Sequence, residues 1–207
     1  MRRPLRQFLE EIAGEKAPSP PLKFSVLHML LALELIAEEP IGRSRLAQKL
    51  SVGEGAVRTI LRRLEDSGLI VISKAGCSLT EEGLSLWKEY SSIVKKVEIG
   101  KSELSSAEHN FAVLVRNQGY KLKSGMDQRD AAVMAGAKNA TTIVLKDGKL
   151  VIPSVTNDLV KDFPRAANQL KILKPGEMDV IMIVGSDSSE KSEYGALAAA
   201  WTLLDKH

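Results

Sequence analysis

The stretch SVGEGAVRTILRRLEDSGLI, residues 51–70, decides the fold that we predict for the N-terminal part of the chain. Its apolar residues recur at the spacing of one helix face, at Val57, Ile60, Leu61 and Leu64. Arginines follow on the other side of the same helix. This pattern predicts a helix that packs on a core through one face while its arginine face meets a partner.

The signals around this helix predict its two ends and a hairpin after it. Ser51 and Glu54 have the spacing of a capping box, which predicts a helix start at Ser51. Gly68 is typical of a helix end. Residues 69–80 then read as a strand, a tight turn at residues 74–76 and a second strand.

Two further helices are predicted upstream. Residues 22–39 are almost entirely apolar, which indicates a buried helix, and residues 42–50 form a shorter one. Three helices and a hairpin make a winged helix-turn-helix. The string RLAQKLSVGEGAVRTILRRLEDSGLI, at residues 45–70, and LTEEG, at residues 79–83, resemble that superfamily, so we expect a winged-helix domain at residues 22–83.

The bulk composition limits the classes of function. Of 207 residues 44% are hydrophobic, and the net charge is only +3. Aromatic residues make up 4%, which disfavours a protein that stacks on single-stranded bases. Cys77 is the one cysteine, and the three histidines show no ligand spacing, so we expect no disulfide, metal or cofactor. With no signal peptide or spanning segment visible, we expect a cytoplasmic protein that does not enter a membrane.

The N-terminal residues 1–21 read as an amphipathic helix followed by a proline-rich linker. A helix this short is stable only when it packs against something. Its own domain and a second subunit are both candidates for that packing.

A connector is predicted after the hairpin. Residues 80–98 read as one helix that Thr80 can cap, and a heptad seam runs along it through Gly83, Trp87, Tyr90, Val94 and Val97. The seam fits packing on its own domain or a dimer contact. Because winged-helix regulators are often dimers, the resemblance favours a connector and dimerisation helix at residues 84–99, with Trp87, Tyr90 and Val94 in the contact.

Residues 100–207 are expected to form a small α+β domain with a mixed or antiparallel sheet. Strands are predicted at residues 111–117, 141–153 (a hairpin that turns at Asp147-Gly148) and 179–186. Helices are predicted at residues 127–137, 157–170 with a break at Pro164, and 190–207. The whole chain is therefore predicted to be α+β.

The arginine face predicts contact with double-stranded DNA. A recognition helix enters the major groove with its N-terminal part, and arginine can grip phosphates or the edge of guanine. The residues expected on or near the outer face and at the DNA are Arg43, Arg45, Arg58, Thr59, Arg62, Arg63 and Lys74.

Two polar clusters in the C-terminal domain are candidates for binding a small-molecule effector. The first comprises Asp127, Arg129 and Asp130 beside Thr141 and Thr142, although Asp127 can equally be a helix N-cap. The second is the strand-to-helix turn with Asp187, whose acids suit a cationic ligand, although Ser188 or Ser189 can be a plain cap there.

The architecture resembles archaeal two-domain proteins that join a winged helix to a domain of unknown function. This resemblance implies a transcriptional regulator that reads DNA as a homodimer, with a C-terminal domain for effector sensing or assembly. No G-x-S-x-G, P-loop or H-E-x-x-H motif occurs, so no enzyme is expected. The alternatives are a winged-helix protein–protein adaptor and a small-molecule enzyme with a DNA-binding half.

Overall fold

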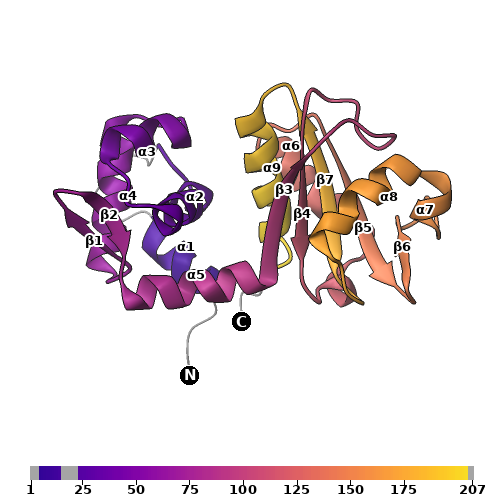
Figure 1. Ribbon diagram of the computed structural model, residues 1–207, viewed down its shortest axis with the longest axis horizontal. Coiled ribbons are helices and arrows are strands. Elements are labelled where there is room, and N and C mark those ends of the chain that lie inside the picture. The colour runs from indigo at the N-terminus through magenta and orange to yellow at the C-terminus, as the bar shows by residue number, and fades with distance from the viewer. Residues whose placement is uncertain (1–4, 15–22, 205–207) are drawn as a thin grey trace. The chain divides into compact units, whose positions relative to one another are not determined.

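The computed structural model describes residues 5–14 and 23–204, which form two compact units (Figure 1). The described residues up to Ser91 make the first unit, and residues from Ser92 to Leu204 make the second. No helix among these described residues has both the length and the apolar character needed to cross a membrane.

The first unit is a winged helix preceded by one additional helix. Its elements are α1 (Leu5–Ala13), α2 (Val26–Glu38), α3 (Arg43–Leu50), α4 (Glu54–Asp66), β1 (Ile70–Ser73), β2 (Gly76–Leu79) and α5 (Glu81–Ile93). The apolar face predicted for α4 is buried, with Ile60 and Leu64 fully enclosed. The three-helix arrangement predicted from the apolar pattern is thereby confirmed.

The predicted capping box at the start of α4 is wrong. Ser51 ends α3 in the left-handed conformation, with φ of 52°, and its N–H bonds to carbonyls of α3. Ser51 therefore belongs to the end of α3 and cannot cap α4. The N-cap of α4 is Gly53, which has no side chain to form a capping hydrogen bond. The predicted end is confirmed, because Gly68 has φ of +74° and the Leu69 N–H bonds to the Leu64 carbonyl at 2.9 Å.

The wing is formed by β1 and β2, which pair antiparallel with Ile70 opposite Leu79. Their turn lies at Lys74 and Ala75, as predicted. An antiparallel bridge between Ile41 and Cys77 joins the wing to the segment between α2 and α3. Cys77 is buried there, and burial raises the pKa of its thiol.

Helix α1 packs on its own unit, against α2 and α4. Leu5 and Leu9 are buried in these contacts. The sequence left two partners open for this helix, its own domain and a second subunit. Among the described residues, the helix packs on its own domain. The proline-rich linker predicted at the end of residues 1–21 lies outside the described residues.

The predicted connector helix is too long. Helix α5 ends at Ile93, and Val94–Ile99 forms strand β3, which pairs with β4 (His109–Val115). The stretch VKKVEI has apolar residues that fit either a helix or a strand, and the hydrogen bonds available along β4 decide for the strand. The heptad seam is therefore interrupted, and three of its members, Gly83, Tyr90 and Val94, are buried within the chain.

The second unit is built on a five-stranded sheet with the order β3-β4-β7-β5-β6, in which every neighbouring pair is antiparallel. This confirms the α+β class and selects the antiparallel alternative. The remaining elements are η1 (Gly119–Lys121), α6 (Met126–Met134), β5 (Asn139–Lys146), β6 (Lys149–Val151), α7 (Leu159–Asp162), α8 (Pro164–Leu170), η2 (Lys171–Leu173), β7 (Val180–Ser186) and α9 (Ser189–Trp201).

Helices cover both faces of this sheet. Helices α6 and α9 pack on one face, and α7, α8 and η2 cover the other, where Leu114, Ile143 and Ile181 belong to the core (Figure 1). Pro164 is the first residue of α8, so the predicted break in residues 157–170 is confirmed.

Candidate nucleic-acid interface

The outer face of α4 presents two arginines. Arg58 and Arg62 are exposed and lie one helical turn apart, opposite the buried Val57 and Leu61. Neither guanidinium has a hydrogen bond or an ion pair among the residues that the structure describes. Two permanently positive groups with fork geometry therefore project from the surface, and their donors remain for a partner.

The N-terminal turn of α4 is accessible to a large partner. A Cβ added at Gly53 or Gly55 would meet nothing within 4 Å, so the backbone there is open to close approach. The Thr59 hydroxyl donates to the Gly55 carbonyl at 3.1 Å, so its proton is used within the helix while its oxygen can still accept. The carboxylate of Glu54 accepts the Ser44 hydroxyl at 3.2 Å, which links α3 to the start of α4.

The prediction that Arg63 lies on the outer face is wrong. Its side chain is only 7% exposed, and its Nη1 donates to the carbonyls of Ile12 at 3.0 Å and Gly14 at 2.7 Å. The guanidinium also lies 5.5 Å from the ring centroid of Phe24. Arg63 thus attaches the C-terminal end of α1 to α4. The spacing contained a signal for this role, because Arg63 follows the buried Ile60 by three positions and flanks the apolar face.

The remaining predicted DNA contacts differ in how available they are. Arg43 begins α3 and is exposed, and Lys74 is exposed in the turn of the wing. Arg45 is exposed too, but its guanidinium forms an ion pair with Glu39 at 2.8 Å. A phosphate would compete with that carboxylate for Arg45.

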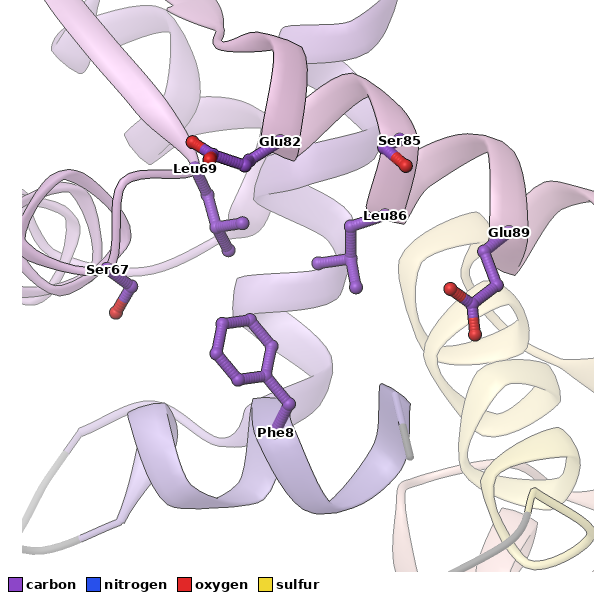
Figure 2. Close-up of a pocket in the computed structure, with 7 residues that line it drawn as sticks. All are labelled: Phe8, Ser67, Leu69, Glu82, Ser85, Leu86 and Glu89. Atoms are coloured by element: carbon purple, nitrogen blue, oxygen red, sulfur yellow. The ribbon is translucent and has the colours of Figure 1, made fainter. Parts of the chain in front are cut away.

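A pocket of about 410 Å³ lies within the first unit, between α1, α5 and the segment that follows α4, and no sequence pattern predicted it. Figure 2 shows that Phe8 of α1 points into it toward Leu69 and Leu86, with Glu82 and Glu89 of α5 around it. The spacing of Leu5, Phe8, Leu9 and Ile12 along the predicted amphipathic helix indicates only that Phe8 belongs to its apolar face. A pocket depends on how three elements meet, which a periodic pattern does not encode.

The structure does not bring the first predicted effector cluster together. Asp127, Arg129 and Asp130 lie on exposed positions of α6, whose N-cap is Gly125 and not Asp127. Thr141 and Thr142 are neighbours in β5, so their side chains point to opposite faces of the sheet. Buried Thr142 donates to the Gly125 carbonyl at 3.4 Å and is used in packing.

The second predicted effector site is paired within the chain. The carboxylate of Asp187 lies 3.2 Å from Lys191 Nζ and 3.4 Å from Lys138 Nζ. The hydrogen bond from Lys191, and the positive charge of both lysines, lower the pKa of Asp187. Ser188 caps α9 by accepting the Lys191 N–H, so the plain-cap alternative for Ser188 is confirmed. The charge expected to attract a cationic ligand is already balanced.

The residues predicted for dimerisation are mostly enclosed. Tyr90 is 5% exposed, and burial together with the charge of Glu34 in α2 raises the pKa of its hydroxyl. Val94 is buried in β3, where it pairs with Val115. Trp87 is half-exposed, and its ring centroid lies 5.4 Å from that of Tyr90. Tyr90 and Val94 are therefore used inside the chain, and of the three only Trp87 is partly open to a second copy.

Comparison with known proteins supports the two-domain reading. Residues 27–85 match the family model described as PH0730-like, N-terminal domain, and residues 106–203 match a domain of unknown function, DUF4443. The hypothetical protein PH0730 from Pyrococcus horikoshii OT3 is 27% identical, with a TM-score of 0.72, and the match covers 87% of this chain and 93% of that protein. The chain is thus similar to an archaeal two-domain protein over nearly its whole length.

Other solved structures match less than half of the chain. A MarR-family protein of Mycobacterium tuberculosis in complex with DNA is 25% identical, with a TM-score of 0.31, over 44% of this chain and 64% of that one. The same protein in complex with salicylic acid is 26% identical, with a TM-score of 0.30 over the same shares. A search of curated proteins found no match.

Proposed function

We propose that this protein is a regulator that binds double-stranded DNA through α4 and acts as a homodimer. The observation that carries the proposal is the pair Arg58 and Arg62, exposed on a helix whose opposite face is buried in a winged helix. A guanidinium without a partner in its own chain gains most from a phosphate or a guanine edge. The resemblance to winged-helix regulators supports the homodimer.

The geometry suggests how the contacts divide between bases and backbone. Helix α4 enters the major groove with Gly53 and Gly55 close to the DNA, and Arg58 and Thr59 reach base edges or adjacent phosphates. Arg62 lies one turn further along and contacts the backbone. Arg43 and Lys74 flank the helix as phosphate contacts, which fix the register without reading sequence. Two copies would place two such helices about one turn of DNA apart.

The second unit supplies assembly or effector sensing in this proposal. It has its own sheet and its own core, so it can hold a binding surface independent of the wing. Asp127, Arg129 and Asp130 stay candidates for such a surface, because all three are exposed on α6. In the described structure they form an open helix face and no enclosed pocket with Thr141 and Thr142.

Selection of genomic fragments by the purified protein, read by sequencing, tests the proposal. We expect a motif with two-fold symmetry that the variant Arg58→Ala/Arg62→Ala no longer enriches. The matched control Lys161→Ala/Lys171→Ala removes the same charge from exposed positions of α7 and η2 and should enrich the same motif. No motif, or a motif that survives the arginine variant, would refute DNA reading by α4.

A second candidate function, a protein–protein adaptor, is favoured by one feature of the wing. Val71 and Ile72 of β1 are 51% and 45% exposed, and because neighbouring residues of a strand point to opposite faces, each face of the wing carries one exposed apolar side chain. A protein partner could cover them. Salt separates the two candidates, because binding through several phosphates weakens by orders of magnitude between low and moderate salt, whereas an apolar contact does not.

A further inference from the structure

The pocket within the first unit has the dimensions and the surface of a small-molecule site. Its volume of about 410 Å³ falls in the range usual for ligand pockets, roughly 300–1,000 Å³. Its apolar surface comes from three different elements: Phe8 of α1, Leu69 just before β1, and Leu86 of α5. In Figure 2 the Phe8 ring and the two leucines point toward a common space.

The charges around the pocket have one sign. Glu82 and Glu89 of α5 line it two turns apart, and none of the described lining residues is basic. Glu89 already has an interaction within the chain, so Glu82 is the acid that remains available to a ligand. Ser67 and Ser85 supply hydroxyl groups between the apolar and acidic parts. A ligand with an apolar body needs a complementary charge at such a rim, and the face of an aromatic ring also attracts a cation.

The pocket is connected to the DNA-binding helix by its own walls. Ser67 is the C-cap of α4, and Leu69 leads into the wing. The α1 wall is held to α4 by the hydrogen bonds of Arg63 to Ile12 and Gly14. The α5 wall touches the wing closely, since a Cβ added at Gly83 would lie 2.0 Å from the Leu69 carbonyl oxygen. A ligand between α1 and α5 therefore touches the elements that hold α4 and the wing.

We propose that this pocket binds an amphiphilic organic cation, with its apolar body against Phe8, Leu69 and Leu86 and its positive group beside Glu82. Binding changes the affinity of α4 for DNA, because the occupied pocket favours one arrangement of α1 and α5 around the end of α4. The effect on DNA affinity rests on the proposed function, whereas binding of the cation to the pocket does not.

Direct binding is measured on the full-length protein by fluorescence anisotropy with rhodamine 6G, a flat cationic dye. Fluorescein, an anionic dye with a similar ring system, is the charge control. We expect saturable binding of rhodamine 6G and at least tenfold weaker binding of fluorescein. Glu82→Gln should weaken rhodamine binding several-fold, and Phe8→Ala should weaken it as well.

The matched control is Glu81→Gln, which neutralises the neighbouring exposed acid of α5 that does not line the pocket. It should leave rhodamine binding unchanged. Absence of rhodamine binding, equal binding of the two dyes, or equal effects of Glu81→Gln and Glu82→Gln would overturn the proposed site. Circular dichroism of each variant shows that the fold is retained.

The regulatory statement is measured separately, as the affinity for a selected DNA fragment with and without saturating rhodamine 6G. We expect a change of at least threefold in wild type and a smaller change in Glu82→Gln at the same dye concentration. If the dye binds but the affinity for DNA stays unchanged, the proposed coupling between the pocket and DNA binding is wrong, although the binding site itself stands. Dye binding by a protein that selects no DNA would instead contradict the proposed function alone.

Discussion

The outer face of α4 in the first unit and the start of α9 in the second unit look alike in the sequence, because both are clusters of charged residues on a helix. In the structure they differ. Arg58 and Arg62 have no partner among the described residues, whereas Asp187 is paired with Lys138 and Lys191 of its own unit.

This difference shows which charged clusters are candidates for binding. A charge that the fold has already neutralised gains little from a ligand, because the existing ion pair must first be broken. A charge left unpaired at the surface keeps its full interaction for a partner. Sequence patterns place both kinds of residue on helices but do not say which charges meet.

The largest effect is expected at a charged residue of the second unit that is wholly structural. Asp179 is 3% exposed and accepts hydrogen bonds from Arg116 Nη1 at 2.6 Å, from Asn117 N at 2.8 Å and from Gly176 N at 2.8 Å. Asp179→Ala should lower the free energy of unfolding by about 3 kcal/mol, since it leaves buried donors unpaired.

Chemical denaturation followed by the fluorescence of Trp201 measures this change, in a Trp87→Phe background so that the second unit alone reports. The exposed acid Glu108 provides the control, and Glu108→Ala should cost less than about 0.5 kcal/mol. If Asp179→Ala were as stable as the control, the division between structural and available charges would fail.

Two adjacent arginines in α4 sharpen the comparison within one helix. Arg63→Ala should lower the free energy of unfolding by about 2 kcal/mol, because the carbonyls of Ile12 and Gly14 lose a charged donor. Arg62→Ala should change it by less than about 0.5 kcal/mol. The DNA affinities should show the opposite order, with the larger loss in Arg62→Ala at a temperature where both variants are folded. Equal effects of the two substitutions on stability would contradict the buried role of Arg63.

A smaller, pH-dependent effect is expected at the start of α2. His28 is half-buried, and its Nδ1 accepts the Ser25 N–H at 3.0 Å, which requires a neutral ring. Burial lowers the pKa of His28 in the folded state. The folded protein therefore binds a proton at His28 less readily than the unfolded chain does. The contribution of the neutral His28 to the free energy of unfolding is fully present above the ordinary pKa of about 6.5 and is lost as the pH falls below it.

We expect the first unit to be less stable at pH 5 than at pH 7.5, by about 1 kcal/mol, the usual size of a helix cap. Thermal unfolding followed by Trp87 in a Trp201→Phe background measures it. His28→Gln should make the stability of the first unit less dependent on pH. The control His109→Gln, in the second unit, should leave that pH dependence unchanged. A pH dependence that persists in His28→Gln would assign it to another group.

Short-range patterns were enough to predict most of the fold. Residues such as Val57, Ile60 and Leu64 place a helix by periodicity, and Gly68 and Pro164 mark boundaries by backbone chemistry. The stretch at residues 94–99 was missed because its apolar spacing fits a helix as well as a strand. Only pairing with β4, which lies later in the chain, distinguishes them.

The candidate site was predictable in part for the same reason. The exposed positions of Arg58 and Arg62 follow from the apolar face alone. The burial of Arg63 depends on where the carbonyls at the end of α1 come to lie, and the pairing of Asp187 depends on Lys138 from a different element. Contacts between residues distant in the chain are set by packing, and periodicity does not contain them.

The affinity of Arg58→Ala/Arg62→Ala for a DNA fragment selected by the wild-type protein tests the central claim most directly. Titration of a labelled duplex at two salt concentrations, followed by anisotropy, gives both the Kd and its salt dependence. We predict a loss of at least tenfold in affinity and a shallower salt dependence, because phosphate contacts are removed. A variant that binds the duplex as tightly as wild type, with the same salt dependence, would contradict the account.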